Sequence, residues 1–348
     1  MRILFFSFLY RFVRFTTTKI LYFFQWLLLK PKDLEPAVNF GDRNLALISQ
    51  IVPIIFKYRI PKNIGVEIYD LKFPSPIIGA SFKSETKILS TWLDLGLGSV
   101  TMKTIMEKER CGNETPRLQE YIMNGKRSIL NSMGLPGPGI NNFANKIKSS
   151  VLWDYNRPIG ISIGGDSESE YISNIQKLLP YLIGKENYFL ELNISCPNTE
   201  NGKTIADDPN KLDTILQKIR HMTSNVISIK VSPDSKLNLL LAIGEIAKGH
   251  SQILINAGNT QYKTIIETGL NKRSFSMSGG GLSGPELFPR MLEIVKNLTN
   301  SGVPVIATGG ISTIDHVKAV KSQGAILFGM ATALIMDPFC VPRINRIL

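Results

Sequence analysis

The chain has 348 residues, of which 43% are hydrophobic and 20% charged, and this ordinary globular composition excludes a disordered, collagen-like or coiled-coil protein. Its three cysteines, Cys111, Cys196 and Cys340, lie far apart in the sequence and form no C-x-x-C pair. This spacing argues against a disulfide framework or a cysteine-rich metal site, so a reducing compartment is the default location for the protein. The formal net charge is +12, and half of this excess lies in residues 1–32, which contain six basic residues and no acid.

Residues 1–32 are also rich in aromatic side chains, holding ten of the 30 in the chain. A basic segment this apolar is typical of a membrane-surface element rather than a nucleic-acid-binding tail, because tails that track phosphates are seldom so hydrophobic. The remainder of the chain carries only +6, so no nucleic-acid partner is predicted.

The stretch 3–29 is long enough to cross a bilayer, since a crossing helix needs about 20 residues. Arg11, Arg14 and Lys19 would then lie near the bilayer centre, where each costs roughly 2.5–3.5 kcal/mol. On a helical wheel the polar side chains form one narrow stripe, made of Ser7, Arg11, Arg14, Thr18 and Gln25. We therefore predict a helix or helical hairpin in the membrane interface; a true span and a cleaved signal peptide are the alternatives.

Residues 33–64 are predicted to form a helical extension and linker. The apolar stretch 45–56 extends the apolar surface of the first segment, and the linker ends at Pro61-Lys62-Asn63. The domain boundaries that follow are an amphipathic membrane-anchoring segment over 1–32, this extension over 33–64, and a catalytic domain over 65–348.

Beyond residue 65, short β-rich runs alternate with helix-length stretches. The predicted strands are 76–78, 99–103, 159–163, 188–195, 226–231, 253–256, 303–307 and 325–328, with a hairpin-like insert around 128–131. The predicted helices include 171–183, 210–222, 236–248, 285–298 and 314–323. Eight βα units over about 270 residues predict an α/β fold of the (β/α)₈ TIM-barrel type. A doubly wound open sheet is the alternative, weakened because no G-x-G-x-x-G follows the first strand.

Function in such a barrel lies where the strands end, so period-two alternation indicates which side chains point inward. The inward-facing residues near the strand ends are Thr101, Lys103, Glu191, Asn193, Ser228, Lys230 and Asn256. Two lysines among amides favour an anionic ligand, because a partly buried lysine is costly without a neutralising partner. A structural pair between Glu191 and Lys230 is the alternative interpretation.

Glycine-rich segments indicate phosphate binding. They are Ser278–Gly284, Thr308–Ser312 at the end of the seventh strand, and Phe328–Thr332 at the end of the eighth. Converging backbone N–H groups and helix N-termini at these positions form a cradle for a phosphate-bearing cofactor or substrate. The three histidines, His221, His250 and His316, lie in helix-like segments away from the strand ends and are predicted to be solvated or capping residues.

The run LNISCPNT at 192–199 resembles the active-site loop of the dihydroorotate dehydrogenases, FMN enzymes of pyrimidine synthesis. Further matches lie in the family's order across residues 65–340: SVTMKT at 99–104, GNETPR at 112–117, LNSMGLP at 130–136, KVSPD at 230–234, GLSG at 281–284 and the glycine pair at 309–310. The resemblance implies oxidation of dihydroorotate to orotate on an FMN-binding barrel.

The resemblance also assigns roles to residues. Cys196 matches the catalytic base that removes the C5 proton while hydride passes from C6 to flavin N5, and Lys103 matches a lysine near flavin and substrate. The residues that match substrate contacts are Lys103, Asn131, Asn193, Asn198 and Asn256. Those that match FMN contacts are Ala80, Ser81, Lys103, Asn193, Lys230, Gly281, Gly309, Gly310, Ala331 and Thr332.

The resemblance is to two classes of the family at once. A cysteine at the base position is typical of the soluble class 1 enzymes, whereas an apolar helical N-terminus is typical of the membrane-bound class 2 enzymes that reduce quinone. Phe82-Lys83-Ser84, Ala257 and Gly137 depart from the family's patterns. A membrane quinone is the favoured electron acceptor; fumarate, or NAD through a partner subunit, are the alternatives. The implied location is a membrane surface facing a reducing compartment such as the cytoplasmic side, and a homodimer is one oligomeric option.

Three other functions stay open on the sequence. The first is an FMN oxidoreductase acting on another dihydropyrimidine or on a tRNA dihydrouridine. The second is a non-redox lyase or aldolase with a Schiff base at Lys230 or Lys103, because phosphate loops and barrel lysines suit that chemistry too. The third is a catalytically inactive membrane scaffold.

Overall fold

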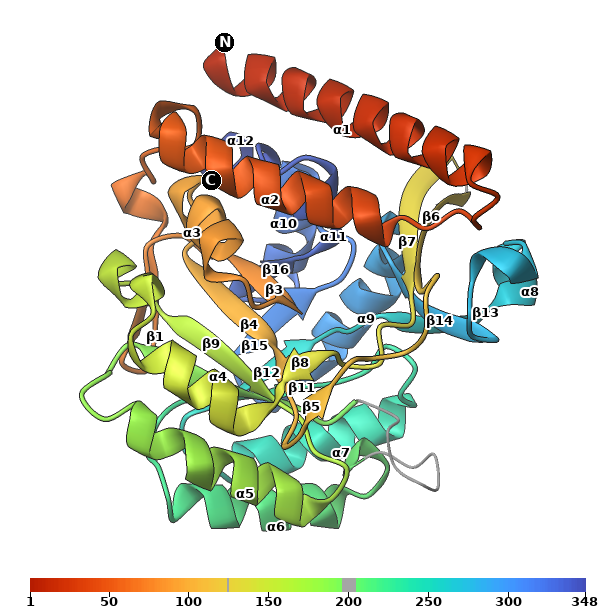
Figure 1. The fold of residues 1–348 in the computed structure, drawn as a ribbon. Coiled ribbons are helices and arrows are strands. Elements are labelled where there is room, and N and C mark those ends of the chain that lie inside the picture. The colour runs from red at the N-terminus through yellow and green to blue at the C-terminus, as the bar shows by residue number, and fades with distance from the viewer. Residues whose placement is uncertain (124, 196–204) are drawn as a thin grey trace.

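Eight parallel strands close into a barrel in the computed structural model, which describes residues 1–123, 125–195 and 205–348 (Figure 1). In chain order the barrel strands are β3 (Ile77–Lys83), β4 (Ser99–Ile105), β9 (Ile159–Ile163), β10 (Tyr188–Asn193), β11 (Ile227–Lys230), β12 (Ile253–Ala257), β15 (Val305–Thr308) and β16 (Leu327–Met330). Each strand pairs with the next along the chain, and β16 pairs with β3 to close the ring. The predicted (β/α)₈ barrel is confirmed, and the open-sheet alternative is wrong.

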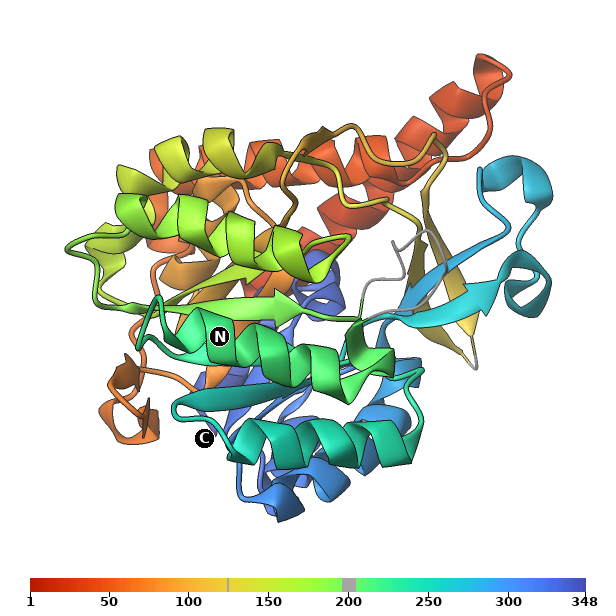
Figure 2. The same cartoon turned by 90° about the horizontal axis from the view of Figure 1, so that it is seen from below.

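Helices cover the outside of the barrel. They are α3 (Thr86–Asp94), α4 (Gly139–Lys148), α5 (Glu168–Leu178), α6 (Pro209–Arg220), α7 (Leu237–Lys248), α9 (Phe288–Leu298), α10 (Ile314–Ser322), α11 (Thr332–Met336) and α12 (Cys340–Asn345). The view from below shows α5, α6 and α7, in green and teal, side by side along one flank (Figure 2). Short 3₁₀ turns add residues at helix ends, as at Leu179–Tyr181 and Pro285–Leu287, so the predicted helices at 171–183 and 285–298 each correspond to a helix and a turn.

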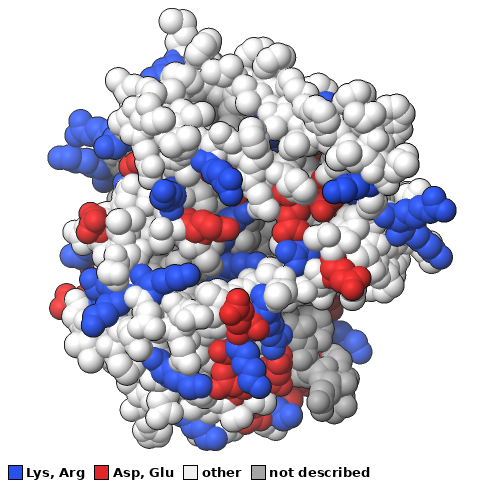
Figure 3. All heavy atoms as spheres, viewed as in Figure 1, with Lys and Arg blue, Asp and Glu red and all other residues white. Residues whose placement is uncertain are grey.

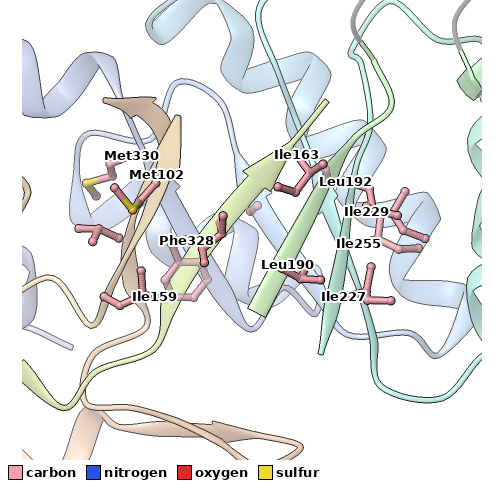
Figure 4. Close-up of a cluster of buried hydrophobic side chains, with 14 of the residues drawn as sticks. Met102, Ile159, Ile163, Leu190, Leu192, Ile227, Ile229, Ile255, Phe328 and Met330 are labelled. Atoms are coloured by element: carbon pink, nitrogen blue, oxygen red, sulfur yellow. The ribbon is translucent and has the colours of Figure 1, made fainter. Parts of the chain in front are cut away.

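The core between strands and helices follows from the alternation of the sequence. Ile159, Ile161 and Ile163 of β9 are fully buried against the helix layer, as are their counterparts on neighbouring strands (Figure 4). Burying each such side chain contributes roughly 1.5–3 kcal/mol. At the floor of the barrel Phe189 fills the interior, and a Cβ on Gly160 would lie 2.5 Å from its ring, so glycine is required there.

A second, antiparallel sheet lies beside the barrel in the order β13-β14-β7-β6 (Figure 1). Its strands are β6 (Leu118–Met123), β7 (Lys126–Asn131), β13 (Gln261–Thr264) and β14 (Gly279–Ser283). The predicted insert around 128–131 is therefore a strand with two partners. The glycine-rich segment 278–284 is mainly a strand as well, and only its end leads into the turn before α9. Shorter elements are β1 (Val66–Ile68), β2 (Leu71–Phe73), β5 (Glu109–Arg110), β8 (Gly137–Pro138) and α8 (Ile265–Thr268).

Two helices from the N-terminal region, α1 (Arg2–Leu27) and α2 (Glu35–Ile51), lie together over one end of the molecule (Figure 1). The polar stripe of α1 faces the protein: the Ser7 hydroxyl donates to Asp337 Oδ2 at 2.7 Å, the Tyr10 hydroxyl donates to the Ile335 carbonyl at 2.8 Å, and Arg14 pairs with Glu120. The side of α1 that packs on the protein thus carries these polar groups together with Ile3 and Phe6, and many of its other apolar side chains are exposed.

The outward side of α1 is exposed and apolar. Phe8, Phe12 and Trp26 are 64%, 57% and 68% exposed, and α2 adds exposed Phe40 and Ile51. The upper part of the surface in Figure 3, over α1 and α2, accordingly carries few charged side chains. Among the described residues, no helix is both long enough and apolar enough to cross a membrane.

Candidate active site

A cavity of about 810 Å³, called the main cavity below, opens at the carboxyl ends of the barrel strands. Its barrel wall consists of Ala80 and Ser81 from β3, Lys230 from β11, Thr308–Gly310 after β15, and Gly329, Ala331 and Thr332 at the end of β16. Its opposite wall comes from α1 and β7, through Phe8, Arg11, Phe12, Arg14, Phe15, Lys126 and Arg127. The cavity therefore joins the predicted cofactor-binding residues to the N-terminal helix.

Lys230 lies in a hydrogen-bonded cluster at the wall of the main cavity. Its Nζ donates to Ser81 Oγ at 2.9 Å, and Ser81 Oγ donates to Glu191 Oε1 at 2.6 Å. Asn256 Nδ2 donates to Glu191 Oε2 at 2.8 Å, and the Glu191 carboxylate lies 3.9 Å from Lys230 Nζ. The Glu191 side chain is 1% exposed, so this buried carboxylate balances the charge of Lys230 and fixes its position.

The structure bears on both interpretations of this pair from the sequence, and the anionic ligand stays a prediction. Glu191 and Lys230 do form a buried pair, as the structural interpretation predicts. Lys230 also lines the cavity, as the ligand interpretation predicts. The inward direction of both side chains follows the predicted alternation, since Ile227 and Ile229 pack on the helix side.

A chain of hydroxyl and amide groups crosses the barrel interior beside this cluster. Asn193 Nδ2 donates to Thr104 Oγ1 at 2.9 Å, and Thr104 shares a 3.0 Å hydrogen bond with Ser162. On the other side Ser195 Oγ donates to Asn193 Oδ1 at 2.8 Å and accepts from Asn259 Nδ2 at 2.7 Å. Asn193 is thus held in one orientation, and it stands three positions before Cys196 in the LNISCPNT run.

Lys103 occupies the end of β4, and burial is the main cause that lowers the pKa of its ammonium group to about 8. Glu85 and Glu35 raise this pKa, whereas Lys83 and Arg117 lower it. The lysine is therefore poised between its charged and neutral forms near physiological pH. It is not among the residues that line the main cavity.

Two ion pairs bind α2 to the barrel near Lys103. Glu35 accepts two hydrogen bonds from Arg117, at 2.8 and 2.9 Å, and Lys83 Nζ lies 2.6 Å from Asp42 Oδ2. The Arg117 guanidinium lowers the pKa of Glu35, whereas burial raises that of Asp42. Lys83, a departure from the family's pattern, therefore has a partner of its own on α2.

The loop after β15, predicted to be part of a phosphate cradle, has a backbone geometry that favours glycine. Gly309 and Gly310 have φ values of +140° and +73°, which L side chains rarely adopt. A Cβ on Gly310 would lie 2.8 Å from the Phe288 amide nitrogen and 3.0 Å from the Gly284 carbonyl oxygen. Backbone therefore approaches backbone here, and only glycine permits it.

Several observations fit a bound flavin nucleotide. A cavity of 810 Å³ lies within the range of pockets that hold cofactors. Among the residues that the structure describes, buried Thr308 Oγ1 at its wall finds no hydrogen-bond partner, and neither does buried Asn256 Oδ1. A ligand with several polar groups would satisfy such atoms, since unsatisfied buried polar groups are costly. Lys230 offers a fixed positive charge at the same wall.

The structure does not describe every predicted site residue. Cys196 and Asn198 lie outside the described residues. Asn131 lies on β7 and donates to the Gly281 carbonyl at 3.1 Å, and Gly281 lies in the middle of β14 rather than at the cavity wall. Of the predicted cofactor contacts, the cavity wall contains Ala80, Ser81, Lys230, Gly309, Gly310, Ala331 and Thr332.

Two groups of cavity residues were not predicted from the sequence. Asn259 and Thr260 line the main cavity, whereas Asn256, three residues earlier, is bonded to Glu191. The signal available in the sequence was the Asn259-Thr260 dipeptide. The family's pattern has a hydroxyl residue directly after Asn256, and this chain has Ala257 at that position. Arg14 and Arg127, which both contact Glu120, could not be found from local pattern.

A smaller cavity of about 190 Å³ lies between α1 and α2, and Arg14 lines both cavities. Its wall is mainly apolar, with Tyr10 and Asp42 among its polar residues. Within the described residues no group of acidic, cysteine or histidine side chains is arranged to hold a metal ion.

Comparison with known proteins gives one consistent family. A family model described as dihydroorotate dehydrogenase matches residues 63–348. The chain is 29% identical over 328 residues to a dihydroorotate dehydrogenase (quinone) of Thermus thermophilus, covering 89% of this chain and 91% of that protein. It is 30% identical over 260 residues to the catalytic subunit of dihydroorotate dehydrogenase B (NAD(+)) of Malacoplasma penetrans, covering 72% and 80%. A dihydroorotate dehydrogenase of Eimeria tenella, solved with ferulenol, shares the fold with a TM-score of 0.73 at 18% identity, covering 88% and 89%.

Proposed function

Because this chain belongs to the dihydroorotate dehydrogenase family and is therefore an oxidoreductase acting on CH–CH donors, we propose that it uses FMN to oxidise dihydroorotate to orotate in pyrimidine biosynthesis. One observation carries the cofactor proposal. Lys230, fixed by Ser81 and Glu191, faces the same cavity as the Gly309-Gly310 loop. A single ligand with an anionic ring system and a phosphate would contact both Lys230 and the Gly309-Gly310 loop.

Residues of the chain would hold FMN as follows. Backbone N–H groups at Gly309, Gly310 and Thr332 would receive the phosphate, because they line the cavity at the starts of α10 and α11. Ala80 and Ser81 would border the ring system, and Lys230 would stabilise negative charge on it. Bound FMN supplies a two-electron acceptor for the hydride that leaves C6 of dihydroorotate.

The chain's own part in the reaction is to bind the substrate and remove a proton. We assign the base to Cys196, whose Sγ would take the C5 proton as a thiolate; a nearby ammonium group such as Lys103 would favour that thiolate. Amides at Asn131, Asn193, Asn198 and Asn256 would orient the ring. The fixed hydrogen bonds of Asn193 support such a role, because a held amide orients a ligand with little entropy loss.

For the electron acceptor we propose a membrane quinone. The main cavity extends from the proposed FMN-holding loops to Phe8, Phe12 and Phe15 of α1, so an apolar acceptor could enter from the helix side. The Thermus relative carries quinone in its name. NAD is the second candidate, because several relatives of comparable identity are named as catalytic subunits of NAD(+) enzymes.

We also propose that residues 1–32 anchor the protein to a membrane surface, with 33–64 as the helical extension and 65–348 as the FMN-binding barrel. The outward apolar face of α1 and α2 supports this, since patches of this kind mark membrane or protein contacts. The proposed location is membrane-associated, facing a reducing compartment.

An anaerobic titration tests the catalytic proposal. Purified protein should show the yellow absorbance of FMN, and dihydroorotate should bleach it, whereas dihydrouracil should not. Quinone, fumarate and NAD are then added in turn to the reduced protein, and the quinone should restore the colour fastest. Colourless protein that cannot be reconstituted with FMN would overturn the proposal.

Vesicle flotation tests the membrane proposal. The full chain should float with phospholipid vesicles, and a chain lacking residues 1–32 should not, while dihydroorotate still reduces its flavin. A matched pair of point variants avoids disturbing the fold. Trp26→Glu on the outward face should weaken flotation, whereas Ile183→Glu, also exposed but outside α1 and α2, should not. Equal flotation of all variants would refute the anchor.

A further inference from the structure

One histidine lies beside the proposed phosphate loop. His221 is the C-cap residue of α6, and His250 pairs with Asp213 at 2.7 Å on the outer helices. His316 differs from both, because it belongs to the first turn of α10 and follows the loop Gly309–Ser312 that lines the main cavity. It takes part in the cap of α10, one of the two roles predicted for it, because its backbone N–H donates to Thr313 Oγ1 at 3.2 Å, and its ring makes further contacts.

The imidazole of His316 has two sets of contacts that hold it in place. Its Nδ1 accepts a hydrogen bond of 3.3 Å from the Ser312 amide. Its face stacks on Phe288, the first residue of α9, with ring centroids 4.2 Å apart and planes 24° apart. The ring therefore joins the end of this loop to the neighbouring helix.

These contacts lie at a close approach of two backbone segments in the predicted cradle. The position where Gly310 would carry a Cβ lies 2.8 Å from the amide nitrogen of Phe288, the residue on which His316 stacks. A shift of the His316 ring would thus disturb its contacts with Ser312 and Phe288 together, close to the point where Gly310 approaches the Phe288 backbone.

The charge state of the ring agrees with its role as an acceptor. Burial is the main cause that lowers the pKa of His316, and Lys126 lowers it further, while the Gly310 backbone and Asp315 act in the opposite direction. A neutral ring leaves Nδ1 free to accept the Ser312 N–H, with the ring proton on the other nitrogen.

We propose that His316 is a positioning residue for the cofactor phosphate: it holds the loop Gly309–Ser312 in the conformation that receives the phosphate of FMN. The identity of the ligand rests on the proposed function, whereas the positioning rests on the contacts of His316. The inference predicts an effect on FMN, which carries the phosphate, and none on riboflavin, which lacks it.

Three variants separate the contacts. His316→Phe keeps an aromatic ring against Phe288 and removes the acceptor. His316→Asn places a carbonyl oxygen near the position of Nδ1 and gives up the stack. His221→Phe makes the same chemical change at an exposed residue of another helix and serves as the matched control.

Dissociation constants for FMN and riboflavin are measured on flavin-stripped protein by quenching of flavin fluorescence. We expect His316→Phe to weaken FMN binding about tenfold, which corresponds to about 1.4 kcal/mol, and to leave riboflavin binding unchanged. His316→Asn should bind FMN within about threefold of the wild type, as rescue of the hydrogen bond by a conservative variant requires. His221→Phe should match the wild type with both flavins.

Three outcomes would overturn the inference: unchanged FMN binding by His316→Phe, equal weakening of FMN and riboflavin, or failure of His316→Asn to restore FMN binding. Hydrogen exchange of the peptide 309–316 adds a readout that does not need flavin, and His316→Phe should exchange its amides faster there. If His316→Phe does not fold, His316→Leu replaces it in both measurements. Wild-type protein that binds neither flavin would overturn the proposed function and this inference with it, whereas the variant results bear on His316 alone.

Discussion

The buried pair of Glu191 and Lys230 allows the electrostatics of the candidate site to be tested quantitatively. Replacing Glu191 with Gln removes a carboxylate that is 1% exposed, accepts hydrogen bonds from Ser81 and Asn256, and lies 3.9 Å from Lys230. Lys230, itself 7% exposed, then keeps its charge without a buried counter-charge. Removing one partner of a buried ion pair costs about 3–5 kcal/mol.

This free energy converts into a measurable shift in melting temperature. For a chain of 348 residues the entropy of unfolding is about 0.7 kcal/mol per kelvin, so we expect Glu191→Gln to lower the Tm by about 4–7 °C. Circular dichroism at one scan rate, with and without added FMN, measures the shift for all variants.

The double variant decides whether charge is the cause. Adding Lys230→Met to Glu191→Gln removes the unpaired ammonium group, so the double variant should be more stable than Glu191→Gln alone by about 2 kcal/mol. Ser81→Ala, which removes a neutral bridge between the two, should cost less than either single charge variant. Destabilisations that simply add in the double variant would refute the reasoning, because they would show that the two charges do not interact.

Three further predictions concern the site's chemistry. Burial lowers the pKa of Lys103 to about 8, so its positive charge is present below pH 8 and is lost as the pH rises through that value. Orotate is an anion, and its affinity for the protein should therefore fall about tenfold per pH unit above pH 8. Binding titrations between pH 6 and 9.5 measure this; Lys103→Arg, which stays charged, should give a flat profile, and a flat wild-type profile would contradict the role. Gly310→Ala should weaken FMN binding more than tenfold, because its Cβ would lie 2.8 Å from the Phe288 backbone. Gly302 has a φ of +80° and open space around it, so Gly302→Ala should lower the stability of the protein without affecting FMN binding. Equal FMN affinity in both variants would argue against the cradle. Cys196→Ala should retain FMN and slow its reduction by dihydroorotate by a factor on the order of 10²–10⁴, and unchanged rapid-mixing kinetics would remove this residue from the mechanism.

The barrel could be predicted because each of its units is encoded locally. Alternation in the run 226–231 turns Lys230 inward and Ile229 outward, and the structure has both as predicted. Glycines after the last two strands likewise indicated the cradle, because positive φ values and close backbone contacts limit which residue can stand there. Strand ends were less accurate, as β3 runs to Lys83 rather than stopping at Ile78.

The contacts that shape the cavities could not be predicted, because they join residues far apart in the chain. Ser7 and Asp337 are 330 positions apart, yet their hydrogen bond turns the polar stripe of α1 toward the barrel. A helical wheel shows that such a stripe exists and cannot show what covers it. Arg14 reaches Glu120 for the same reason, and in doing so it becomes part of both cavities.

The sequence by itself determined the class of fold, the inward residues of its strands and the family, because these depend on periodicity and short motifs that each segment carries alone. Only the tertiary structure decided that α1 lines the main cavity and that Asn259 reaches the cavity wall while Asn256 is bonded to Glu191. It also decided that the His316 ring accepts from the Ser312 amide. Those arrangements follow from how packed elements meet, and the free energy that selects them comes from burial and hydrogen bonds between segments that no local pattern connects.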